Sequence, residues 1–559
     1  MGTAETSIYG SRPWLPRYRP EYPHDVEPEF SSALAMFSDA LRRAPETEIV
    51  RYFDGTLTLA ELDRLSDQFA VALTDRGFEK GQRLATYLQN IPQVLIAAIG
   101  TWKAGGIVVS INPMSRVREL TTLLGDCEAT ALLAEEDLFG QVAAEVVPTI
   151  PSLRIAWTTS PLEFQTRHDP RLFGGMSRVR HEGTEDMSEV LASVGDRTPE
   201  PVELALDDPA FLGYTSGTTG PPKGAMNTHR NVVFNARVYR EWCGLTTEDS
   251  VLGVAPLFHI TGVVAHTAVC LLVPMPLVLA YRFEPNVMLD AIREHRPTFT
   301  AGSITVFIAL MNTEGAVKED LSSLEKIYSG GAPIPPSTVK AFSAHFGHYI
   351  HNIYGLTETT SPSHGTPRGS EAPVDEASGA LSVGVPVFST VVRIMRDDGS
   401  DADVGEVGEI VTRGPQVVPG YWNKPEETEN ALRAPDGSVE LKTGDVGYMD
   451  DQGWFYVVDR KKDQINAGGY KVWPREVEDV LYEHPAVREA AVVGVPDEYR
   501  GETVKAFVSV RPGQSVDPDE LIQFCKERMS AYKYPRQVEL MDEIPKTVTG
   551  KLLRRALRS

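Results

Sequence analysis

Apolar residues along the first 200 positions alternate between helical and extended spacing. Residues 59–77 are predicted to form an amphipathic helix that stops at Gly77, with four apolar residues on one face: Leu62, Leu65, Phe69 and Leu73. The runs that follow, LATYLQN, IPQVLIAAIGTWKAG and GIVVSINP, predict a strand, a buried helix and another strand. Such alternation favours βαβ units, and therefore an α/β fold of layered subdomains around a parallel sheet.

The second half of the chain changes pattern twice. VVRIMRDDGS and GEIVTRG predict a hairpin, so residues 383–458 are expected to form a small β-rich unit. Beyond it, a helix starting at Pro474, two strands and the helix LIQFCKERM predict a small α+β domain. The charged stretch VVDRKKDQ separates these regions. We therefore expect an N-terminal domain over residues 1–461 and a C-terminal domain over residues 462–559.

The longest apolar run, Gly262 to Tyr281, is interrupted by His266, Pro274 and Pro276. Those interruptions predict a buried helix leading into a buried strand and argue against a membrane span. The N-terminal residues also lack the apolar core of a signal peptide.

Composition narrows the function further. The chain has 559 residues with 42% apolar and 23% charged positions, a balance typical of globular proteins with several domains. Its formal net charge of −23 argues against a nucleic-acid partner. Four widely spaced cysteines have no metal-ligand spacing and predict buried thiols in a reducing, cytoplasmic setting. A homodimer is an assembly that the sequence leaves open.

The stretch YTSGTTGPPKG, Tyr214 to Gly224, is the first candidate for chemistry. Its glycines let the backbone approach a ligand, its hydroxyl groups donate hydrogen bonds, and Lys223 adds positive charge, a combination suited to a polyphosphate. Lys223 follows Pro222 and precedes Gly224, so the stretch is not a Walker A motif and disfavours a P-loop enzyme. A flexible surface loop is the alternative interpretation.

Six further motifs follow this loop in a fixed order, and together the seven resemble the acyl-adenylate-forming family. That family comprises acyl-CoA synthetases, the adenylation domains of nonribosomal peptide synthetases and firefly-type luciferases. The six motifs are APLFHITG, GGAPIP, NIYGLTET, TGDVGYMD, DRKKDQINAGGYKV and PKTVTGK. The resemblance covers nearly the whole chain and implies a large N-terminal domain with a small mobile C-terminal domain. It also implies ATP, Mg²⁺ and coenzyme A as the reaction partners of a small carboxylic acid.

The resemblance assigns the ATP contacts. The phosphate loop contributes Thr215, Ser216, Gly217, Thr218, Thr219 and Lys223. The backbone of Gly331, Ala332, Pro333 and Gly355, with the amide of Asn352, would lie against adenine, and Tyr354 would stack on it. Thr357 would donate to phosphate oxygens, and Glu358 would ligate Mg²⁺. Asp445 would accept from the ribose hydroxyls, and Arg460 is the second nucleotide contact.

The resemblance also assigns the C-terminal residues. Lys551 is the expected catalytic lysine, because its ammonium would offset the repulsion between a carboxylate and the α-phosphate of ATP. Lys462 takes the hinge position about which the small domain would pivot between half-reactions. After that pivot Gly468, Gly469 and Tyr470 would line the channel for CoA.

The acyl side is assigned to His259, Gly330, Ile353 and Gly355. Amino-acid-activating relatives carry an aspartate in the motif that holds His259, so the expected substrate lacks an α-amino group and His259 would position its carboxylate. PWLPRYRPEYP and INPMSRVREL resemble segments of bacterial fatty-acid–CoA ligases, which favours a medium- or long-chain fatty acid. Many of those enzymes have glycine where this chain has Ile353, so an aryl or hydroxycinnamic acid is the second candidate.

Three other activities remain open at this point. One is a luciferase-like oxygenase that uses the same adenylate, and another is a ligase that loads the acyl group onto a carrier protein. The third is a nucleotide-binding relative without catalysis, which the filled catalytic positions disfavour.

Overall fold

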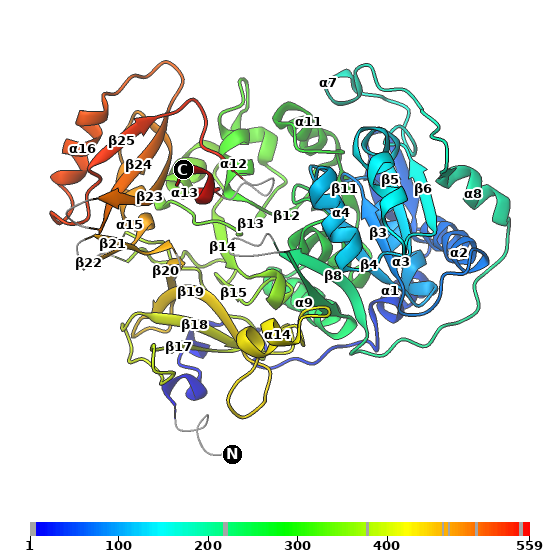
Figure 1. Ribbon diagram of the computed structural model, residues 1–559, viewed down its shortest axis with the longest axis horizontal. Helices are drawn as coiled ribbons and strands as arrows, with labels where there is room; N and C mark the ends of the chain where they lie inside the picture. Colours follow the sequence, from blue (N-terminus) through cyan, green and yellow to red (C-terminus); the bar gives the residue numbers. More distant parts are fainter. Residues whose placement is uncertain are drawn as a thin grey trace.

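The computed structural model is shown in Figure 1. It describes residues 7–215, 222–375, 379–460, 463–467, 470–497, 501–546 and 552–558. Within these ranges the strands form four sheets, three before residue 460 and one after it. The architecture is the layered α/β fold that the sequence predicts.

The first sheet confirms the predicted βαβ alternation. Its order is β7-β6-β5-β3-β4-β8-β9, and its neighbours pair in parallel except for the antiparallel pair β8–β9. The strands are β3 (Arg83–Tyr87), β4 (Ile107–Ile111), β5 (Ala131–Glu135), β6 (Ile155–Thr159), β7 (Glu185–Asp186), β8 (Pro209–Thr215) and β9 (Lys223–Thr228).

Helices α2 (Leu59–Asp75) and α3 (Gln93–Lys103) pack against one another beside this sheet. A reciprocal capping box between Thr58 and Glu61 starts α2, which satisfies two backbone donors that have no partner within the helix. Gly77 then adopts φ = 78°, the left-handed conformation that ends a helix. Of the four predicted apolar residues of α2, Leu62, Phe69 and Leu73 are fully buried, as an amphipathic helix requires.

The second sheet runs in the order β16-β15-β14-β13-β12-β10-β11-β1-β2. Its strands are β1 (Glu48–Tyr52), β2 (Gly55–Thr58), β10 (Val251–Leu252), β11 (Leu277–Leu279), β12 (Phe299–Gly302), β13 (Lys326–Ser329), β14 (Ile350–Tyr354), β15 (His364–Gly365) and β16 (Val385–Pro386). The main hydrophobic core takes residues from both sheets and from the helices between them, so the two sheets fold as one body.

The remaining longer helices of this body flank the sheets (Figure 1). They are α1 (Ala33–Arg43), α4 (Val117–Asp126), α8 (Met187–Val194), α9 (His229–Cys243), α11 (Pro285–His295), α12 (Ile304–Met311) and α13 (Pro336–Phe346). A further helix, α14 (Pro425–Leu432), packs against the third sheet.

The interrupted apolar run at 262–281 forms the predicted helix and strand. A π-helical segment, Gly262–Ala268, continues into α10 (Val269–Leu272) and then into β11, and nearly every residue of the run is buried. In the part of the chain that the structure describes, no helix is long and apolar enough to cross a membrane. The four cysteines are buried free thiols.

The third sheet is the predicted β-rich unit. It is an antiparallel meander of β17 (Val391–Met395), β18 (Gly408–Arg413), β19 (Leu441–Met449) and β20 (Phe455–Arg460). Beyond it, β21 (Ile465–Ala467), β22 (Tyr470–Val472), β23 (Val487–Asp497), β24 (Gly501–Val510) and β25 (Gln537–Leu540) form a separate sheet.

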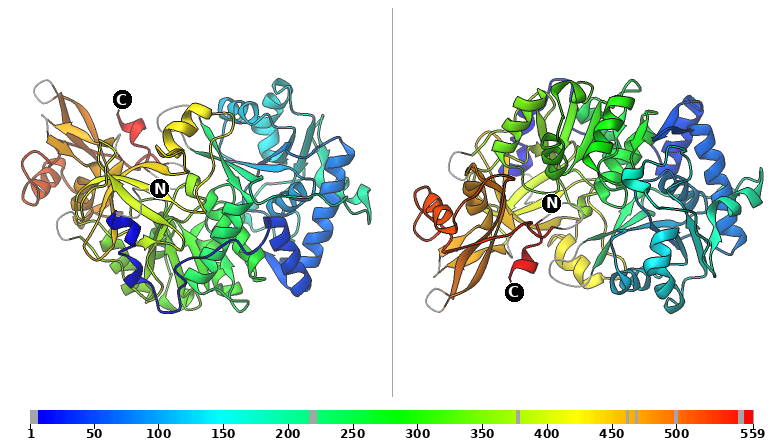
Figure 2. Two further views of the ribbon diagram at one scale, coloured as in Figure 1. Left: turned by 90° about the horizontal axis from the view of Figure 1, so that it is seen from below. Right: turned by 90° about the horizontal axis from the view of Figure 1, so that it is seen from above.

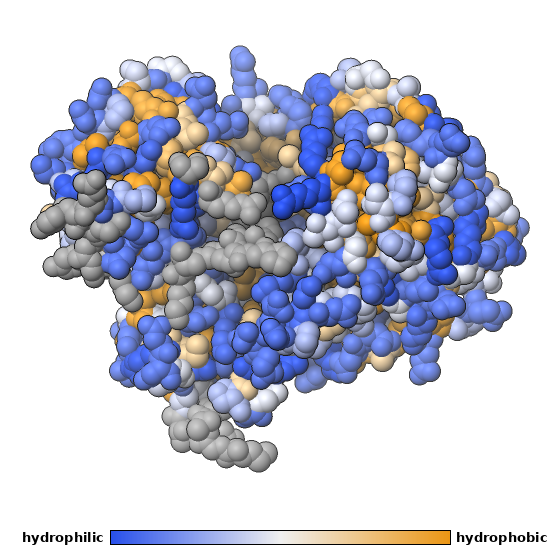
Figure 3. Space-filling view, viewed as in Figure 1, coloured by the Kyte–Doolittle hydropathy of each residue, from blue (hydrophilic) through white to orange (hydrophobic). Residues whose placement is uncertain are grey.

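Helices α15 (Pro474–Tyr482) and α16 (Pro518–Lys526) pack on this last sheet around a core of their own. The C-terminal unit therefore stands apart at one end of the molecule in all three views (Figures 1 and 2). The face shown in Figure 3 is mostly polar.

Candidate active site

Buried amide side chains donate hydrogen bonds to the backbone of the turn after β14, residues 355–361. Asn235 on α9 donates from Nδ2 to the carbonyl oxygens of Thr359 (3.0 Å), Thr360 (2.8 Å) and Ser361. Asn227 at the end of β9 donates to the carbonyl oxygen of Thr357 (2.9 Å). These bonds satisfy backbone acceptors that regular structure leaves unpaired, and they hold the turn against β9 and α9.

Sequence reasoning did not identify Asn227 and Asn235. Their signal was the spacing of three asparagines four residues apart, at 227, 231 and 235, across the start of α9. Asn231 uses its side chain in the helix cap and on the carbonyl oxygen of Pro415 (2.7 Å), which ties the third sheet to the same helix.

Two predicted nucleotide contacts meet above this turn. The Tyr354 hydroxyl donates to Asp445 Oδ2 at 2.7 Å, although the two residues are 91 positions apart. Asp445 is buried and lies opposite Arg460 in the β19–β20 register, so the backbone of Arg460 is its neighbour. The Tyr354 ring is packed edge-on by His364, whose burial lowers its pKa to about 3 and keeps it neutral. An aromatic face beside a carboxylate suits an adenosine moiety.

A second cluster brings together the predicted phosphate residue and the predicted metal ligand. Glu358 Oε1 accepts a hydrogen bond from the Tyr421 hydroxyl at 2.8 Å. Lys223 Nζ lies 5.4 Å from the centroid of the same tyrosine ring, within cation–π range. Thr215 and Thr357 border this cluster, since Thr215 pairs with Lys223 in the β8–β9 register and Thr357 precedes Glu358. Tyr421 was not predicted from the sequence.

The site suits Mg²⁺ only as an ion bound largely by substrate. Glu358 supplies one partly exposed carboxylate, and among the described residues no group of three His, Cys, Asp or Glu gathers to form a metal site. Mg²⁺ is commonly held by one or two carboxylates together with phosphate oxygens and water. The donor set therefore fits a phosphate-bound ion, and Glu358 is the residue that would hold it.

The turn after β13 contains Gly330 and Gly331, whose backbone is not covered by a side chain of their own. Gly330 is one of the predicted acyl contacts. A side chain at Gly330 would place its Cβ 2.3 Å from the carbonyl oxygen of Ile353, and Gly331 adopts φ = 77°. Ala332 and Pro333 continue this turn towards α13. A Cβ added at Gly355 would lie 3.1 Å from the Cα of Pro362. Larger residues would thus displace the backbone at both predicted contacts.

Two predicted side chains of β14 are buried among protein groups. Ile353 is only 6% exposed and packs over Gly330, whose Cβ would meet its Cγ1 at 3.0 Å. Asn352 donates from Nδ2 to the carbonyl oxygen of Ser382 at 2.9 Å. That bond orients the amide, and it uses one of the donors that the sequence analysis assigned to adenine.

His259 lies in the loop before the π-helical segment, and its Nδ1 accepts from the backbone N–H of Thr261 at 3.3 Å. The preceding loop is fastened by Asn90, which follows β3 of the other sheet. Asn90 Nδ2 donates to the carbonyl oxygens of Gly253 (3.2 Å) and Ala255 (3.0 Å), and its Oδ1 accepts from Leu257 N–H (2.8 Å). Asn90, like Asn227, Asn235 and Tyr421, was not predicted from the sequence.

Several predicted residues lie outside the described ranges: Ser216, Gly217, Thr218, Thr219, Lys462, Gly468, Gly469 and Lys551. Tyr470 begins β22. Three residues after Lys551, Arg554 forms ion pairs with Asp459 (3.3 Å), Asp463 (3.4 Å) and Glu478 (2.8 Å). The C-terminal segment is therefore fastened beside the boundary between the two units.

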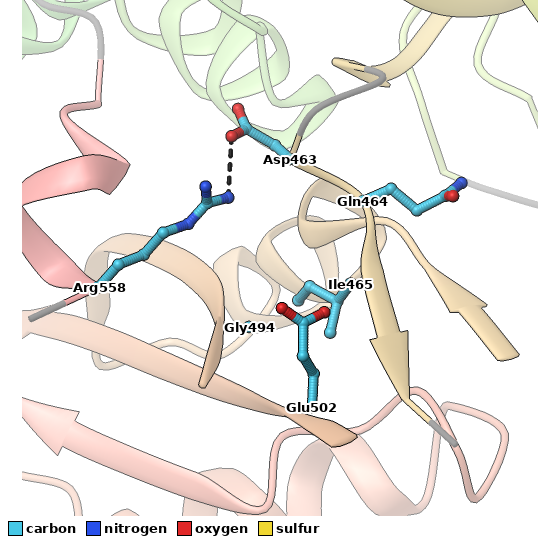
Figure 4. Close-up of a pocket in the computed structure, with 6 residues that line it drawn as sticks. All are labelled: Asp463, Gln464, Ile465, Gly494, Glu502 and Arg558. Atoms are coloured by element: carbon cyan, nitrogen blue, oxygen red, sulfur yellow. Dashed lines mark hydrogen bonds and ion pairs between the residues drawn. The ribbon is translucent and has the colours of Figure 1, made fainter. Parts of the chain in front are cut away.

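A pocket near this boundary contains none of the predicted site residues. It is lined by Asp463, Gln464, Ile465, Gly494, Glu502 and Arg558. Arg558 reaches across it to Asp463 at 2.9 Å (Figure 4). Because its lining belongs wholly to the C-terminal unit, the pocket is separate from the Tyr354 and Glu358 clusters.

The fold and these clusters define a class of protein: a two-part α/β protein whose larger body carries an aromatic–carboxylate pair and a lysine–carboxylate pair. Comparison with known proteins gives the family. The family model described as AMP-binding enzyme matches residues 37–422, and that of the AMP-binding enzyme C-terminal domain matches residues 476–551. The chain belongs to the AMP-binding enzyme family.

Relatives and solved structures agree with this assignment. The chain is 35% identical to a long-chain-fatty-acid–CoA ligase from Bacillus subtilis, with 98% of each chain covered. It is 34% identical to a feruloyl-CoA synthase from an Amycolatopsis species, covering 92% of this chain and 96% of the relative. The crystal structure of the anthranilate CoA ligase AuaEII with anthranoyl-AMP superposes with a TM-score of 0.85 at 25% identity, covering 95% and 97% of the two chains.

Proposed function

We propose that the protein is an ATP-dependent, AMP-forming acid–CoA ligase. The observation that carries this proposal is the meeting of Tyr354 with Asp445 and of Glu358 with Lys223 across Tyr421. Tyr354 and Asp445 would bind adenosine. Glu358 and Lys223 provide the opposite charges that a metal-bound polyphosphate requires. Two relatives of similar length, one named a CoA ligase and the other a CoA synthase, support the same reaction.

In the first half-reaction the substrate carboxylate attacks the α-phosphorus of ATP, and pyrophosphate leaves. Tyr354 and Asp445 hold the adenosine, while Lys223 neutralises the departing phosphates. Glu358 is the residue that would hold Mg²⁺, and the ion would supply charge neutralisation at the phosphate oxygens. Lys551 bridges the attacking carboxylate and the α-phosphate, and so stabilises the negative charge that accumulates as they approach.

In the second half-reaction the thiol of CoA attacks the acyl carbonyl, and AMP leaves with the former carboxylate oxygen. For this step the small domain, residues 462–559, pivots about Lys462 and presents Gly468, Gly469 and Tyr470 to the pantetheine arm. A glycine at 469 leaves room for that arm, which a side chain would obstruct.

The proposed acid is a medium- or long-chain fatty acid, and the long-chain-fatty-acid–CoA ligase from Bacillus subtilis among the relatives supports this choice. His259 orients its carboxylate, and the bare backbone at Gly330 and Gly355 borders the acyl group. An aryl or hydroxycinnamic acid is the second candidate. The buried, β-branched Ile353 beside Gly330 favours a flatter substrate, and a feruloyl-CoA synthase is among the relatives.

The decisive experiment measures AMP release with a panel of linear, branched and aromatic acids, with and without CoA. A fatty-acid preference with CoA-dependent thioester formation is expected. Transfer only to a carrier protein would contradict the CoA assignment, and light from luciferin and oxygen would point to an oxygenase. Lys551→Ala should lower acid-dependent pyrophosphate release by roughly 10²–10³-fold, because it removes one charge-stabilising group. Unchanged release would remove Lys551 from the mechanism.

A further inference from the structure

Among the residues that the structure describes, the Tyr421 side chain contacts both Glu358 and Lys223, two groups assigned to the polyphosphate and its metal ion. Its hydroxyl reaches Glu358 Oε1 at 2.8 Å, and its ring lies 5.4 Å from Lys223 Nζ. It comes from the third sheet's long β18–α14 connection, 63 residues after Glu358. The sequence around it, PGYWN, contains no charged or nucleophilic residue, so it gives no chemical signal by itself.

We propose that Tyr421 is a positioning residue that orients the Glu358 carboxylate toward the phosphate-bound Mg²⁺ and seats Lys223 on its ring. One side chain thereby sets the separation of a negative and a positive group that face the same polyphosphate. The proposal rests on the roles given to Glu358 and Lys223 in the proposed function.

The backbone around Tyr421 is fastened on both sides, so the ring occupies a defined place. Residue 421 forms a β-bridge with Ala225 on the phosphate-loop strand, and Trp422 N–H donates to the carbonyl oxygen of Gly224 at 2.8 Å. On the other side, Val418 N–H donates to the carbonyl oxygen of Glu358 at 2.9 Å. The segment therefore connects β9 to the metal-ligand turn through backbone bonds.

The Tyr421 hydroxyl donates to one oxygen of the Glu358 carboxylate, Oε1, at 2.8 Å. A donor held on Oε1 leaves the second carboxylate oxygen to face the ion. Groups that hydrogen-bond to a metal ligand in this way fix its orientation, and their loss typically lowers metal affinity or activity about 10–100-fold.

The test compares the wild-type protein with Tyr421→Phe and Tyr421→Leu. The phenylalanine variant keeps the ring under Lys223 and loses only the bond to Glu358, while the leucine variant loses both contacts. Two Mg²⁺ titrations are made at fixed ATP: one of acid-dependent pyrophosphate release, and one of the thermal stabilisation of the protein by ATP without acid. The second reports binding in the absence of turnover.

For Tyr421→Phe we expect both Mg²⁺ midpoints to rise about 10–100-fold, with unchanged stabilisation by metal-free ATP. For Tyr421→Leu the stabilisation by metal-free ATP should also fall, because Lys223 loses its cation–π contact with the tyrosine ring. Tyr456→Phe is the matched control. Tyr456 is a buried tyrosine whose hydroxyl donates to the Asp450 carboxylate at 3.1 Å, and its loss should leave both midpoints unchanged.

Equal Mg²⁺ midpoints for Tyr421→Phe and wild type would overturn the proposal. The proposal would also be overturned if Tyr421→Phe lost as much stabilisation by metal-free ATP as Tyr421→Leu does. That result would mean that the substitution disorders the segment around residue 421, and not that it misorients the Glu358 carboxylate. Failure of the proposed function has a different signature. The wild type would then release no pyrophosphate with any acid, while the ATP stabilisation titration would still report on Tyr421.

Discussion

Two tyrosine–glutamate pairs in this protein form the same kind of hydrogen bond, from the tyrosine hydroxyl to the glutamate carboxylate. The two carboxylates differ in how far they are exposed to solvent. Tyr421 donates to Glu358 at 2.8 Å, and Tyr281 donates to Glu135 at 3.0 Å. Glu358 is partly exposed in a turn of the candidate active site, whereas Glu135 is 1% exposed at the end of β5.

Burial gives the second pair a structural role. It raises the pKa of Glu135 to about 7, an effect only partly offset by the hydrogen bonds from Gln89 N–H and the Tyr281 hydroxyl. The carbonyl oxygen of Tyr281 accepts from Asn90 N–H at 2.9 Å, and Asn90 in turn fastens the loop before His259. The Glu135 pair therefore joins the two large sheets, whereas the Glu358 pair presents a carboxylate. Exposure, and not the hydrogen bond, separates the two roles.

The largest expected effect comes from Glu358→Gln. The amide keeps an oxygen for the Tyr421 hydroxyl and loses the charge that binds the ion, so pyrophosphate release should fall roughly 10²–10³-fold. The free energy of unfolding should change by less than about 1 kcal/mol, because the side chain is partly exposed. Single-turnover kinetics and urea unfolding measure the two quantities. Full activity in this variant would show that Glu358 does not act on the phosphates.

Glu135→Gln should act in the opposite way, on stability and not on metal dependence. The folded-state pKa of Glu135 is raised from 4.5 to about 7, so its contribution to stability is complete below pH 4.5 and is lost as pH rises through 7. The shift corresponds to about 3 kcal/mol. Urea unfolding at pH 5 and pH 8 should therefore show a smaller decline for the variant than for the wild type. Parallel declines would contradict a raised pKa at this site.

Tyr281→Phe should have the smallest effect, about 1 kcal/mol of lost unfolding free energy, because it removes one buried donor. It should also move the pH dependence of stability further upward, since the Tyr281 hydroxyl lowers the pKa of Glu135. The Mg²⁺ midpoint should stay at the wild-type value, in contrast to Tyr421→Phe. A raised midpoint in Tyr281→Phe would mean that the two pairs are coupled, and the comparison would fail.

Local patterns predicted the elements well. The helix at 59–77, the alternation that follows it, the hairpin in the β-rich unit and the helix starting at Pro474 are all present. Each depends on the spacing of apolar residues, on a capping box or on a proline, which act within a few residues. The motifs also identified the family, because their order along the chain can be read without knowing where they meet.

Contacts between motifs could not be predicted in the same way. Asn90, Asn235 and Tyr421 hold the three parts of the candidate site, yet each looks ordinary within its own segment. Their roles depend on partners 63 to 198 positions away. The order of strands in the sheets decides which distant residues come into contact. That order cannot be inferred from the residues adjacent in the sequence.

The sequence by itself determined the elements, the α/β class and the residue types available for adenylation, because periodicity and composition are local properties. Only the tertiary structure decided that Tyr354 meets Asp445 and that Tyr421 stands between Lys223 and Glu358. It also decided which of two similar glutamates is buried. The physical reason is that burial and the proximity of distant groups follow from the packing of whole sheets, which no single segment specifies.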